Sequence, residues 1–398
     1  MRFTSVVLSA AAASAAAIAR QESPALSAKV LIGSPGSIAV VDYNGKEFKT
    51  VANDTRAGTS PSWMVFKEPN LIYAVDENSN DTRLFNFDPV TNELKFVQNA
   101  TGSGGVVSLE FNSDKTRLVG TSFGQGTIDV WDISDGASLK LIKTLQSEGT
   151  LGPNKVRQDK SRAHQAILDP SGRFFAVTDL GTDSILIIDS KDDAFTISNR
   201  VLVPSPGCGP RHGAWYPAKA AQATHYILAC ELTNNLEVFK VSANGSSLAF
   251  TRTQELSTYG AAFPPANATS AAAGEVVVSA DGKDVYVSNR LSGNDTDSIS
   301  HFRIKQAAAT AGSSCKNATA ADIELEFVEA VSSGGQIPRM FSLSRDDKTL
   351  FSTNQQGELG LVAFNRVEGK LIATPAASLP ASLFGPLGFG PQFVQQIA

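Results

Sequence analysis

The sequence has little net charge and contains no run of basic residues. Its 34 Lys and Arg are set against 39 Asp and Glu, which gives a formal net charge of −5. Nucleic-acid-binding domains concentrate positive charge on one surface, so this composition argues against a nucleic acid partner. No stretch reaches the roughly 20 uninterrupted apolar residues that cross a bilayer, so we predict that the protein does not span a membrane.

Cysteine and histidine are also scarce, with three and four residues. This is too few cysteines for a disulfide framework, and neither residue type shows metal-ligand spacing. We interpret Cys208, Cys230 and Cys315 as core thiols, with a bridge between Cys208 and Cys230 as the alternative. The chain also lacks a glycine-rich phosphate loop, so we predict neither a metal nor another cofactor.

The N-terminus has the pattern of a secretory signal peptide: a basic residue, a short apolar region and a small-x-small site at Ala17-Ile18-Ala19. An alanine-rich N-terminal helix in a cytosolic protein is the alternative. Secretion is favoured by the Asn-x-Ser/Thr sequons, which mark glycosylation sites. These sequons begin at Asn53, Asn80, Asn99, Asn244, Asn267, Asn294 and Asn317. We predict a signal peptide over 1–19 and a secreted glycoprotein over 20–398, and leave its oligomeric state open.

The rest of the chain repeats one pattern. An apolar run, a turn, a second apolar run ending in a polar residue and a third alternating run recur, as in RAHQAILDPSGRFFAVTDLGTDSILIIDS and GEVVVSADGKDVYVSNRLSGNDTDSISHFRI. Short runs rich in Val, Ile, Phe and Tyr between turn residues are typical of strands. The second runs end at Asp76, Ser122, Asp179, Glu231, Asn289 and Asn354, with an earlier equivalent near Ser34. Seven such units predict an all-β fold, a seven-bladed β-propeller.

The two ends of the chain complement each other. The first unit lacks an innermost strand, whereas the C-terminus carries an extra strand-like segment, PQFVQQIA at 391–398. We predict that this segment pairs with the N-terminal blade and closes the ring. Closure removes the exposed sheet edges that would otherwise invite aggregation.

Several charged residues occupy equivalent places in successive units. In a propeller these places converge on the central axis, so residues distant in sequence meet there. His164, Arg211 and His212 open first runs, Glu231 and Arg290 end second runs, and Arg339 and Glu77 occupy related places. Arginine binds carboxylates through two donors, and histidine exchanges protons near neutral pH. The set therefore predicts a site for an anionic substrate that undergoes proton transfer.

Four motifs resemble one family, the lactonase-type seven-bladed propellers. The motifs are H-x-x-x-x-D-P-x-G-R (164–173), G-P-R-H (209–212), S-x-D-G-K-x-x-Y-V-S-N-R (279–290) and G-G-x-x-P-R-x-F (334–341). The family includes the propeller form of 6-phosphogluconolactonase and the fungal carboxy-cis,cis-muconate cyclase, which forms a lactone. Ser62-Trp63-Met64 is similar to the cyclase branch. G-P-R-H, and P-R-x-F followed by Asn354-Gln355, are more similar to the lactonase branch.

The resemblance implies a catalytic set and a substrate-binding set. The catalytic residues would be His164, Arg211, Glu231 and Arg290; the substrate-binding residues would be His212, Arg339, Glu77, Arg157 and Gln355. The sequence departs from the lactonase pattern at Arg162-Ala163-His164, where the family has His-x-His, and at Ser122-Phe123, where it has Asn-Tyr.

We expect cofactor-independent lactone chemistry on a small anionic lactone or dicarboxylate. In hydrolysis His164 would be the base, Arg211 and Arg290 would stabilise the oxyanion, and Glu231 would orient the histidine or shuttle protons. Lactonisation of a muconate by the same groups is one alternative. A secreted binding propeller without catalytic activity is the other, because a fold does not fix a function.

Overall fold

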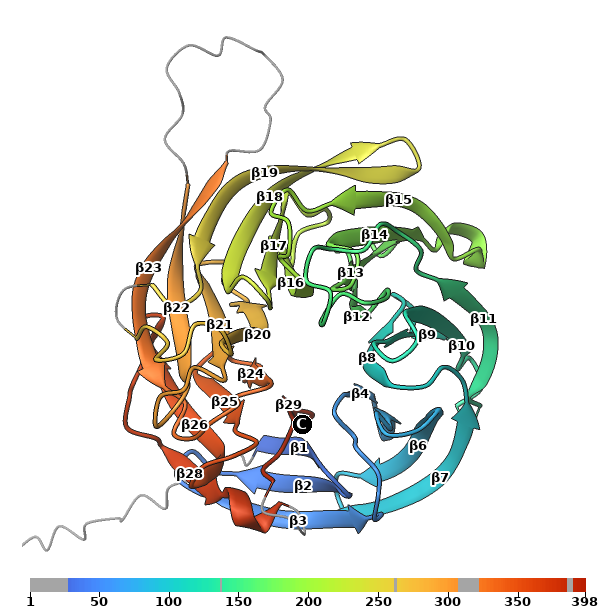
Figure 1. Ribbon diagram of the computed structural model, residues 1–398. Helices are drawn as coiled ribbons and strands as arrows, with labels where there is room; N and C mark the ends of the chain where they lie inside the picture. The colour runs from blue at the N-terminus through green and yellow to red at the C-terminus, as the bar shows by residue number, and fades with distance from the viewer. Residues whose placement is uncertain (1–27, 137, 261–262, 307–321, 385–388) are drawn as a thin grey trace, which may run out of the picture.

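A computed structural model describes residues 28–136, 138–260, 263–306, 322–384 and 389–398. Seven antiparallel sheets stand as blades around a central axis in this part of the chain (Figure 1). The prediction of a seven-bladed β-propeller is therefore confirmed. The proposed signal peptide over 1–19 lies outside the described residues. Within the described ranges, no helix is long and apolar enough to cross a membrane.

The first four blades each contain four strands, ordered from the axis outward. Blade 1 consists of β29(Phe393–Gln396), β1(Ala28–Ser34), β2(Ser37–Tyr43) and β3(Phe48–Thr55). Blade 2 consists of β4(Met64–Lys67), β5(Leu71–Val75), β6(Asp81–Asp88) and β7(Glu93–Thr101). Blade 3 consists of β8(Val106–Phe111), β9(Arg117–Ser122), β10(Thr127–Asp132) and β11(Lys140–Gln146). Blade 4 consists of β12(Ala163–Leu168), β13(Phe174–Asp179), β14(Ser184–Asp189) and β15(Thr196–Leu202).

The last three blades follow the same order. Blade 5 consists of β16(Pro210–Tyr216), β17(His225–Cys230), β18(Asn235–Asn244) and β19(Ser247–Ser257). Blade 6 consists of β20(Ala272–Val278), β21(Asp284–Arg290), β22(Ser298–Gln306) and β23(Ile323–Ser332). Blade 7 consists of β24(Phe341–Leu343), β25(Thr349–Thr353), β26(Leu359–Val367) and β28(Ala377–Pro380), with β27(Lys370–Leu371) beside the end of β26. The described helices are the short 3₁₀ turns η1(Lys191–Asp193) and η2(Ala381–Leu383).

The position of a strand within its blade explains its sequence. Middle strands pack against neighbouring blades on both faces, so they are apolar almost throughout, as in Ser-Ile-Leu-Ile-Ile-Asp of β14, where every residue is buried. Outermost strands face solvent on one side, and β11 alternates half-buried and exposed residues along Lys-Leu-Ile-Lys-Thr-Leu-Gln. A sheet with one solvated face shows such an alternation.

The C-terminal strand closes the ring, as predicted. β29 pairs antiparallel with β1 and becomes the innermost strand of blade 1, with Ile32 opposite Val394 and Gly33 opposite Phe393. The side chains of Phe393, Val394 and Ile397 are at most 2% exposed. Figure 1 shows β29 beside β1 at the middle of the ring, so the two ends of the chain complete one blade.

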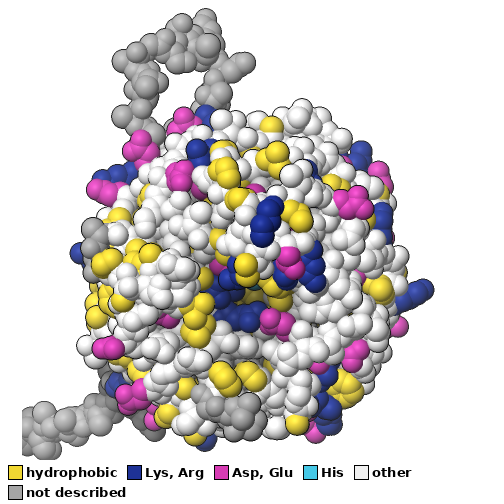
Figure 2. All heavy atoms as spheres, in the orientation of Figure 1, with side chains coloured by type: hydrophobic (Ala, Val, Ile, Leu, Met, Phe, Trp, Pro, Cys, Tyr) yellow, Lys and Arg dark blue, Asp and Glu magenta, His cyan; other side chains and the backbone are white. Residues whose placement is uncertain are grey.

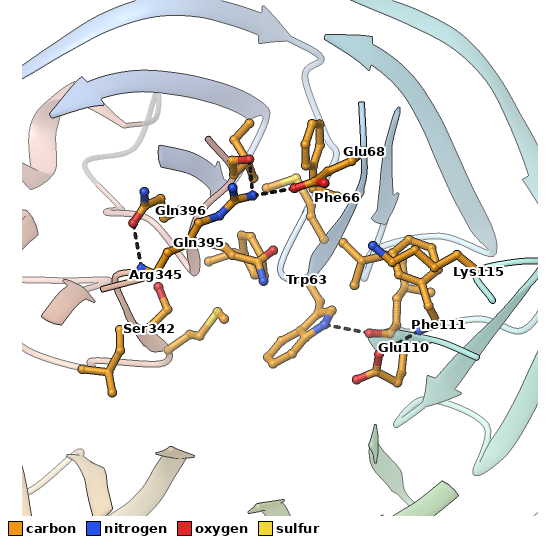
Figure 3. A pocket seen from close by; sticks show the side chains of 17 residues that line it. Trp63, Phe66, Glu68, Glu110, Phe111, Lys115, Ser342, Arg345, Gln395 and Gln396 are labelled. Carbon is orange, nitrogen blue, oxygen red and sulfur yellow. Dashed lines mark hydrogen bonds and ion pairs between the residues drawn. The ribbon is translucent and has the colours of Figure 1, made fainter. Parts of the chain in front are cut away.

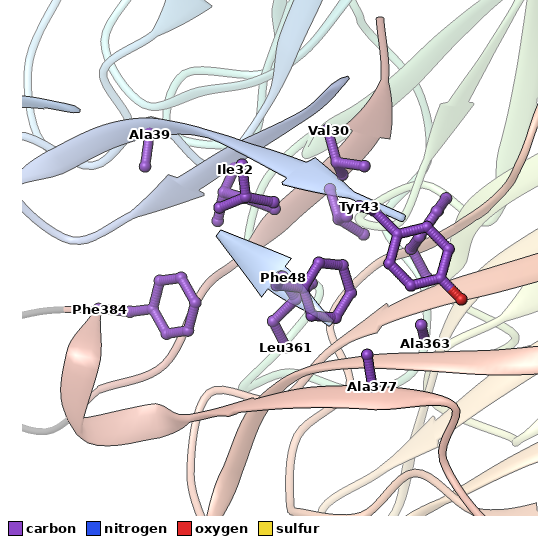
Figure 4. Packing of buried hydrophobic residues seen from close by; sticks show 12 residues of the cluster. Val30, Ile32, Ala39, Tyr43, Phe48, Leu361, Ala363, Ala377 and Phe384 are labelled. Carbon is purple, nitrogen blue, oxygen red and sulfur yellow. The ribbon is translucent and has the colours of Figure 1, made fainter. Parts of the chain in front are cut away.

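Blades 1 and 7 are joined by an apolar cluster (Figure 4). Tyr43 and Phe48 of blade 1 pack against Phe351 of blade 7, and the ring centroids of Tyr43 and Phe351 are 5.2 Å apart. Val394 of the C-terminal strand belongs to the same cluster. The tail therefore contributes to the packing between the first and last blades as well as to the hydrogen bonds of blade 1.

Deleting residues 391–398 is expected to destabilise the whole ring. Each fully buried apolar side chain contributes roughly 1.5–3 kcal/mol, and the deletion also leaves the backbone groups of β1 unpaired. Thermal unfolding measures the effect. The double change Phe393→Ala and Val394→Ala keeps the strand's backbone and should lower Tm less. A truncated protein with an unchanged Tm would contradict closure by this strand.

Candidate active site

The innermost strands β12 and β16 each contain a β-bulge near their first residue. The register of β12 against β13 skips His164, and that of β16 against β17 skips Arg211. A bulge redirects the side chain of the extra residue. Each bulge is fixed by a threonine of the preceding blade, since Thr121 Oγ1 donates to the His164 carbonyl at 2.8 Å and Thr178 Oγ1 to the Arg211 carbonyl at 2.6 Å. Two predicted site residues are thus presented by the same local structure.

The turn before Arg211 requires glycine. Gly207 and Gly209 have φ of 80° and 62°, a region that disfavours residues with a Cβ. A Cβ on Gly209 would also stand 2.5 Å from Leu232 Cγ. The Gly209 carbonyl accepts a 2.9 Å hydrogen bond from the N–H of Glu231. This turn therefore sets Arg211 next to Glu231.

A disulfide fixes the same turn. Cys208 and Cys230 are bonded to each other, so the interpretation of these residues as core thiols is wrong and the alternative bridge is correct. Cys208 lies in the turn before β16 and Cys230 is the last residue of β17, where it pairs with Pro210. Both lie near Glu237 in the described residues, but sulfurs bonded to each other do not act as thiolate ligands. Cys315 lies outside the described residues.

Glu231 gathers three arginines from three parts of the chain. Its Oε2 lies 3.0 Å from Arg211 Nε of β16 and 3.0 Å from Arg290 Nη2 of β21. Its Oε1 pairs with Arg157 from the connection between blades 3 and 4. The Glu231 side chain is 6% exposed. One buried carboxylate therefore holds three guanidinium groups together.

The charges of this cluster shift its pKa values. Burial alone would raise the pKa of Glu231, but Arg290, Arg211 and Arg157 together lower it to about 2. Burial and the charge of Arg290 lower the pKa of Arg211 to about 9, against the opposing effect of Glu231. Burial also lowers the pKa of Arg290. At neutral pH the Glu231 carboxylate is therefore ionised and the Arg211 guanidinium is protonated.

His164 lies among these cations in an aromatic setting. Its ring is 5.6 Å from that of Phe123 and 5.0 Å from that of His212. Burial, followed by the charge of Arg211, lowers the pKa of His164 well below its ordinary value. Its Nδ1 is buried without a hydrogen-bond partner among the residues described. The imidazole is therefore neutral at neutral pH and available to a ligand.

The residue after each bulge forms a second layer, lower in the channel. Gln165, His212 and Glu275 come from β12, β16 and β20, at equivalent places in three consecutive blades. His212 Nδ1 lies 2.8 Å from Glu275 Oε1 and 3.4 Å from Gln165 Nε2. The indole of Trp63 is 5.3 Å from the His212 ring. This layer forms the floor of the candidate site.

Two other predicted substrate-binding residues pair with each other. Arg339 Nη2 lies 2.8 Å from Glu77 Oε2, and the charge of Arg339 contributes to the lowered pKa of His164. Gln355 follows β25; its N–H donates to the Ile337 carbonyl at 3.2 Å, and its carbonyl accepts from Gly390 at 2.8 Å. Arg339 and Glu77 thus add to the charged cluster around His164. The contacts of Gln355 are made by its backbone, and they fix the chain near Ile337 and Gly390.

The face of the ring seen in Figure 2 is hollowed at its centre, with Lys or Arg side chains gathered in the hollow and acidic side chains beside them. The site set contains four arginines, at positions 157, 211, 290 and 339, and three glutamates, at positions 77, 231 and 275. One positive charge is therefore in excess. This balance favours an anionic ligand.

Two cavities border the His212 layer, and Gln165 and Glu275 of that layer line the second of them. These cavities, of about 460 and 560 Å³, share Trp63, Glu110 and Met340 in their lining. Figure 3 shows Trp63 in the first cavity, with Arg345 and Glu110 on opposite sides. Burial raises the pKa of Glu110 to about 7. The four arginines of the site set and His164 line neither of these cavities.

The sequence predicted the members of the site better than their contacts. We expected Glu231 to orient the histidine or to shuttle protons; the contacts described for its side chain are with arginines. Glu275 was not predicted, although its position in its blade matches that of His212. The signal was a carboxylate at the start of the otherwise apolar Gly-Glu-Val-Val-Val segment, one residue after the place equivalent to Arg211.

Comparison with known proteins agrees with this architecture. Residues 29–381 match the family described as "Lactonase, 7-bladed beta-propeller". A protein of Arthroderma benhamiae named "Probable 6-phosphogluconolactonase" is 32% identical over 275 residues, which cover 64% of this chain and 66% of that protein. The 6-phosphogluconolactonase of Bacillus subtilis is 26% identical, covering 80% of this chain and 84% of the relative.

Solved structures share the fold. The periplasmic gluconolactonase of Pseudomonas aeruginosa superposes with a TM-score of 0.74 at 20% identity, covering 94% of this chain and 99% of that one. A Lactobacillus plantarum protein superposes with a TM-score of 0.73 at 21% identity, covering 94% of this chain and 100% of that one. With the family match over 29–381 and the geometry of the ring, these findings settle the family. The chain belongs to the seven-bladed β-propeller lactonases.

Proposed function

We propose that the protein hydrolyses the ring ester of a small anionic lactone at the mouth of its central channel. Two relatives are named 6-phosphogluconolactonases, which supports this reaction class. The observation that carries the proposal is Arg211, which is 2% exposed and whose Nη1 has no hydrogen-bond partner among the described residues. A buried cation with a free donor, next to neutral imidazoles, suits a carbonyl oxygen that gains negative charge.

The reaction needs three contributions from the chain. Arg211 and Arg290 hold the lactone carbonyl and stabilise the oxyanion that forms when water attacks. A neutral imidazole, from His164 or His212, takes the proton from that water as the new carbon–oxygen bond forms. The tetrahedral intermediate then collapses, the bond to the ring oxygen breaks, and that oxygen takes a proton. Glu231 keeps the arginines oriented, and Arg339, Glu77 and Arg157 border the site.

We further propose that the enzyme is secreted and acts on a sugar-acid lactone outside the cytosol. The Cys208–Cys230 bridge supports this proposal, because disulfides persist in oxidising compartments. So do the sequons, since glycosylation needs surface exposure. Asn53, Asn80, Asn99, Asn244 and Asn267 are exposed, Asn294 is half-buried, and Asn317 lies outside the described residues. Intact mass of the protein from culture medium tests processing near residue 20 and glycan addition.

A substrate panel tests the reaction. Glucono-δ-lactone and its 6-phosphate are followed by acid release in a pH-stat, and 3-carboxy-cis,cis-muconate by ultraviolet absorbance. We expect lactone hydrolysis above the spontaneous rate. Conversion of the muconate alone would make the protein a cyclase, the branch to which the Ser62-Trp63-Met64 motif is similar. No turnover of either class, together with a measurable binding partner, would favour the binding propeller.

The pH dependence of hydrolysis follows from the buried imidazoles. Burial lowers the pKa of both His164 and His212 from the ordinary value of 6.5. The base must be neutral, so activity is lost only when the pH falls through this lowered pKa. We expect kcat/KM to be level at pH 7 and its acidic limb to have an apparent pKa below 6.5. A limb centred above 6.5 would contradict a base in this buried environment.

A further inference from the structure

Glu275 makes a buried contact with one of the two imidazoles. It lies in β20, directly after a bulge in the pairing of β20 with β21, and is 3% exposed. Its Oε1 is 2.8 Å from His212 Nδ1 and also accepts the N–H of Val276 at 3.1 Å. Its Oε2 is buried with no hydrogen-bond partner in the described part of the chain. The carboxylate therefore has His212 as its close side-chain partner.

This contact determines which nitrogen of His212 carries the proton. A carboxylate only accepts hydrogen bonds, so Nδ1 must donate to Glu275 at 2.8 Å. The contact of Nδ1 with Gln165 Nε2 is longer, at 3.4 Å, while Gln165 Oε1 accepts the N–H of Gly213 at 2.8 Å. In the neutral ring Nε2 then holds the lone pair. Fixing the tautomer in this way is what an acidic partner does for a histidine base.

The charged groups around the two imidazoles differ. Burial lowers the pKa of His212, Glu275 raises it, and Arg211 and Arg290 lower it. Burial lowers the pKa of His164 well below its ordinary value, and the charges of Arg211, His212, Arg339 and Arg290 lower it further. Its Nδ1 has no partner among the residues that the structure describes. His212 is thus the imidazole that is both oriented and kept basic by a carboxylate.

We propose that, if the protein is the lactone hydrolase proposed above, His212 is its general base and Glu275 is the positioning residue that acts through it. Nε2 of His212 takes a proton from water while the water oxygen bonds to the lactone carbonyl carbon, and the imidazolium is stabilised by the Glu275 carboxylate. The imidazolium gives this proton to the ring oxygen as the bond from that oxygen to the carbonyl carbon breaks, which restores neutral His212, and the product carboxylic acid then releases a proton to solvent. His164 contacts the substrate in this arrangement.

The test combines kinetics with a titration that does not need activity. Glu275→Gln keeps the side-chain shape and removes the charge. With 6-phosphoglucono-δ-lactone in a pH-stat, kcat should fall about 10²-fold, KM should stay within about twofold, and the acidic limb of kcat/KM should move lower. In protein labelled with ¹³C at histidine Cε1, the pKa of His212, assigned through His212→Gln, should fall by about one unit or more.

Two control variants separate the possible results. Glu110→Gln changes another glutamate, half-buried in β8, whose Oε1 accepts the N–H of Phe111 at 2.9 Å, and should leave both readouts unchanged. His164→Gln should raise KM more than it lowers kcat. An unmoved His212 pKa in Glu275→Gln, or a moved pKa with an unmoved acidic limb, overturns the proposal. If the wild-type protein does not hydrolyse the lactone, both the proposed hydrolysis and the assignment of His212 as the base are refuted. A lowered His212 pKa in Glu275→Gln would in that case still support the contact between Glu275 and His212.

Discussion

Replacing Arg211 with alanine is expected to lower kcat/KM for lactone hydrolysis by about 10²–10³-fold, the usual effect of losing an oxyanion donor. The guanidinium is presented by a bulge whose carbonyl is held by Thr178, and its Nη1 has no partner in the described structure. It is therefore placed for the substrate rather than for a neighbouring side chain. Initial rates in a pH-stat, below saturation, measure the loss.

The same change is expected to alter Tm little. The fold lowers the pKa of Arg211 to about 9, so the folded chain disfavours the charged form relative to the unfolded chain. Removing the guanidinium relieves repulsion with Arg290 and Arg339, which offsets the lost contact with Glu231 and the void left behind. Arg211→Lys keeps the positive charge but loses the planar guanidinium with its two parallel donors. Its kcat/KM should therefore lie between those of the wild type and Arg211→Ala.

Arg366 provides a matched control, because it is a buried arginine outside the site. Its side chain is 9% exposed, and its Nε lies 2.6 Å from the Tyr286 hydroxyl. Burial would lower its pKa, but Tyr286 and Asp284 raise it above the ordinary value, so its charge stabilises the fold. Arg366→Ala should lower Tm by several degrees and leave kcat/KM of the folded protein unchanged. If Arg211→Ala instead melts lower and hydrolyses lactone normally, the site assignment is wrong.

The sequence predicted the ring because each blade repeats the same local chemistry. Alternation of apolar runs and turns is local, so the seven units and the unpaired C-terminal strand could be recognised without knowing how the blades pack. Equivalent places in a repeat also converge on the axis, which brought Glu231 of blade 5 and Arg290 of blade 6 together although they are 59 positions apart. Because the local pattern of strands and turns repeats, it also predicted which residues, distant in the sequence, meet at the axis.

Side-chain pairing across blades could not be predicted in the same way. In the sequence, Glu275 stands at the start of an apolar, strand-like run, and nothing there indicates a partner. That partner, His212, comes from the preceding blade, 63 positions away. Whether Glu231 faces His164 or the arginines depends on bulges that shift the strands by one residue. The odd cysteine count favoured free thiols, whereas the turn before β16 brings Cys208 against Cys230 at the end of β17.

Replacing Glu231 with glutamine is expected to weaken both the fold and the site. Its pKa of about 2 lies below the ordinary 4.5, so the ionised carboxylate contributes stability above pH 4.5 that is lost as the pH falls toward 2. The shift corresponds to about 3 kcal/mol, in the range for breaking a buried ion pair. Without the carboxylate, Arg157, Arg211 and Arg290 repel one another and lose their orientation, so kcat/KM should fall at least tenfold.

Urea unfolding at pH 7 and at pH 3 tests this account, because it predicts in which direction the stability loss of Glu231→Gln changes with pH. The stability lost in Glu231→Gln should shrink by about half at pH 3, because the unfolded wild type is then protonated while the folded carboxylate is still mostly ionised. Glu237 is the matched control: it is fully buried, and burial raises its pKa, so Glu237→Gln should not reproduce the loss at pH 7. A Glu231→Gln protein as stable as wild type at pH 7 would mean that the three arginines are held by other contacts, and that the carboxylate does not organise the site.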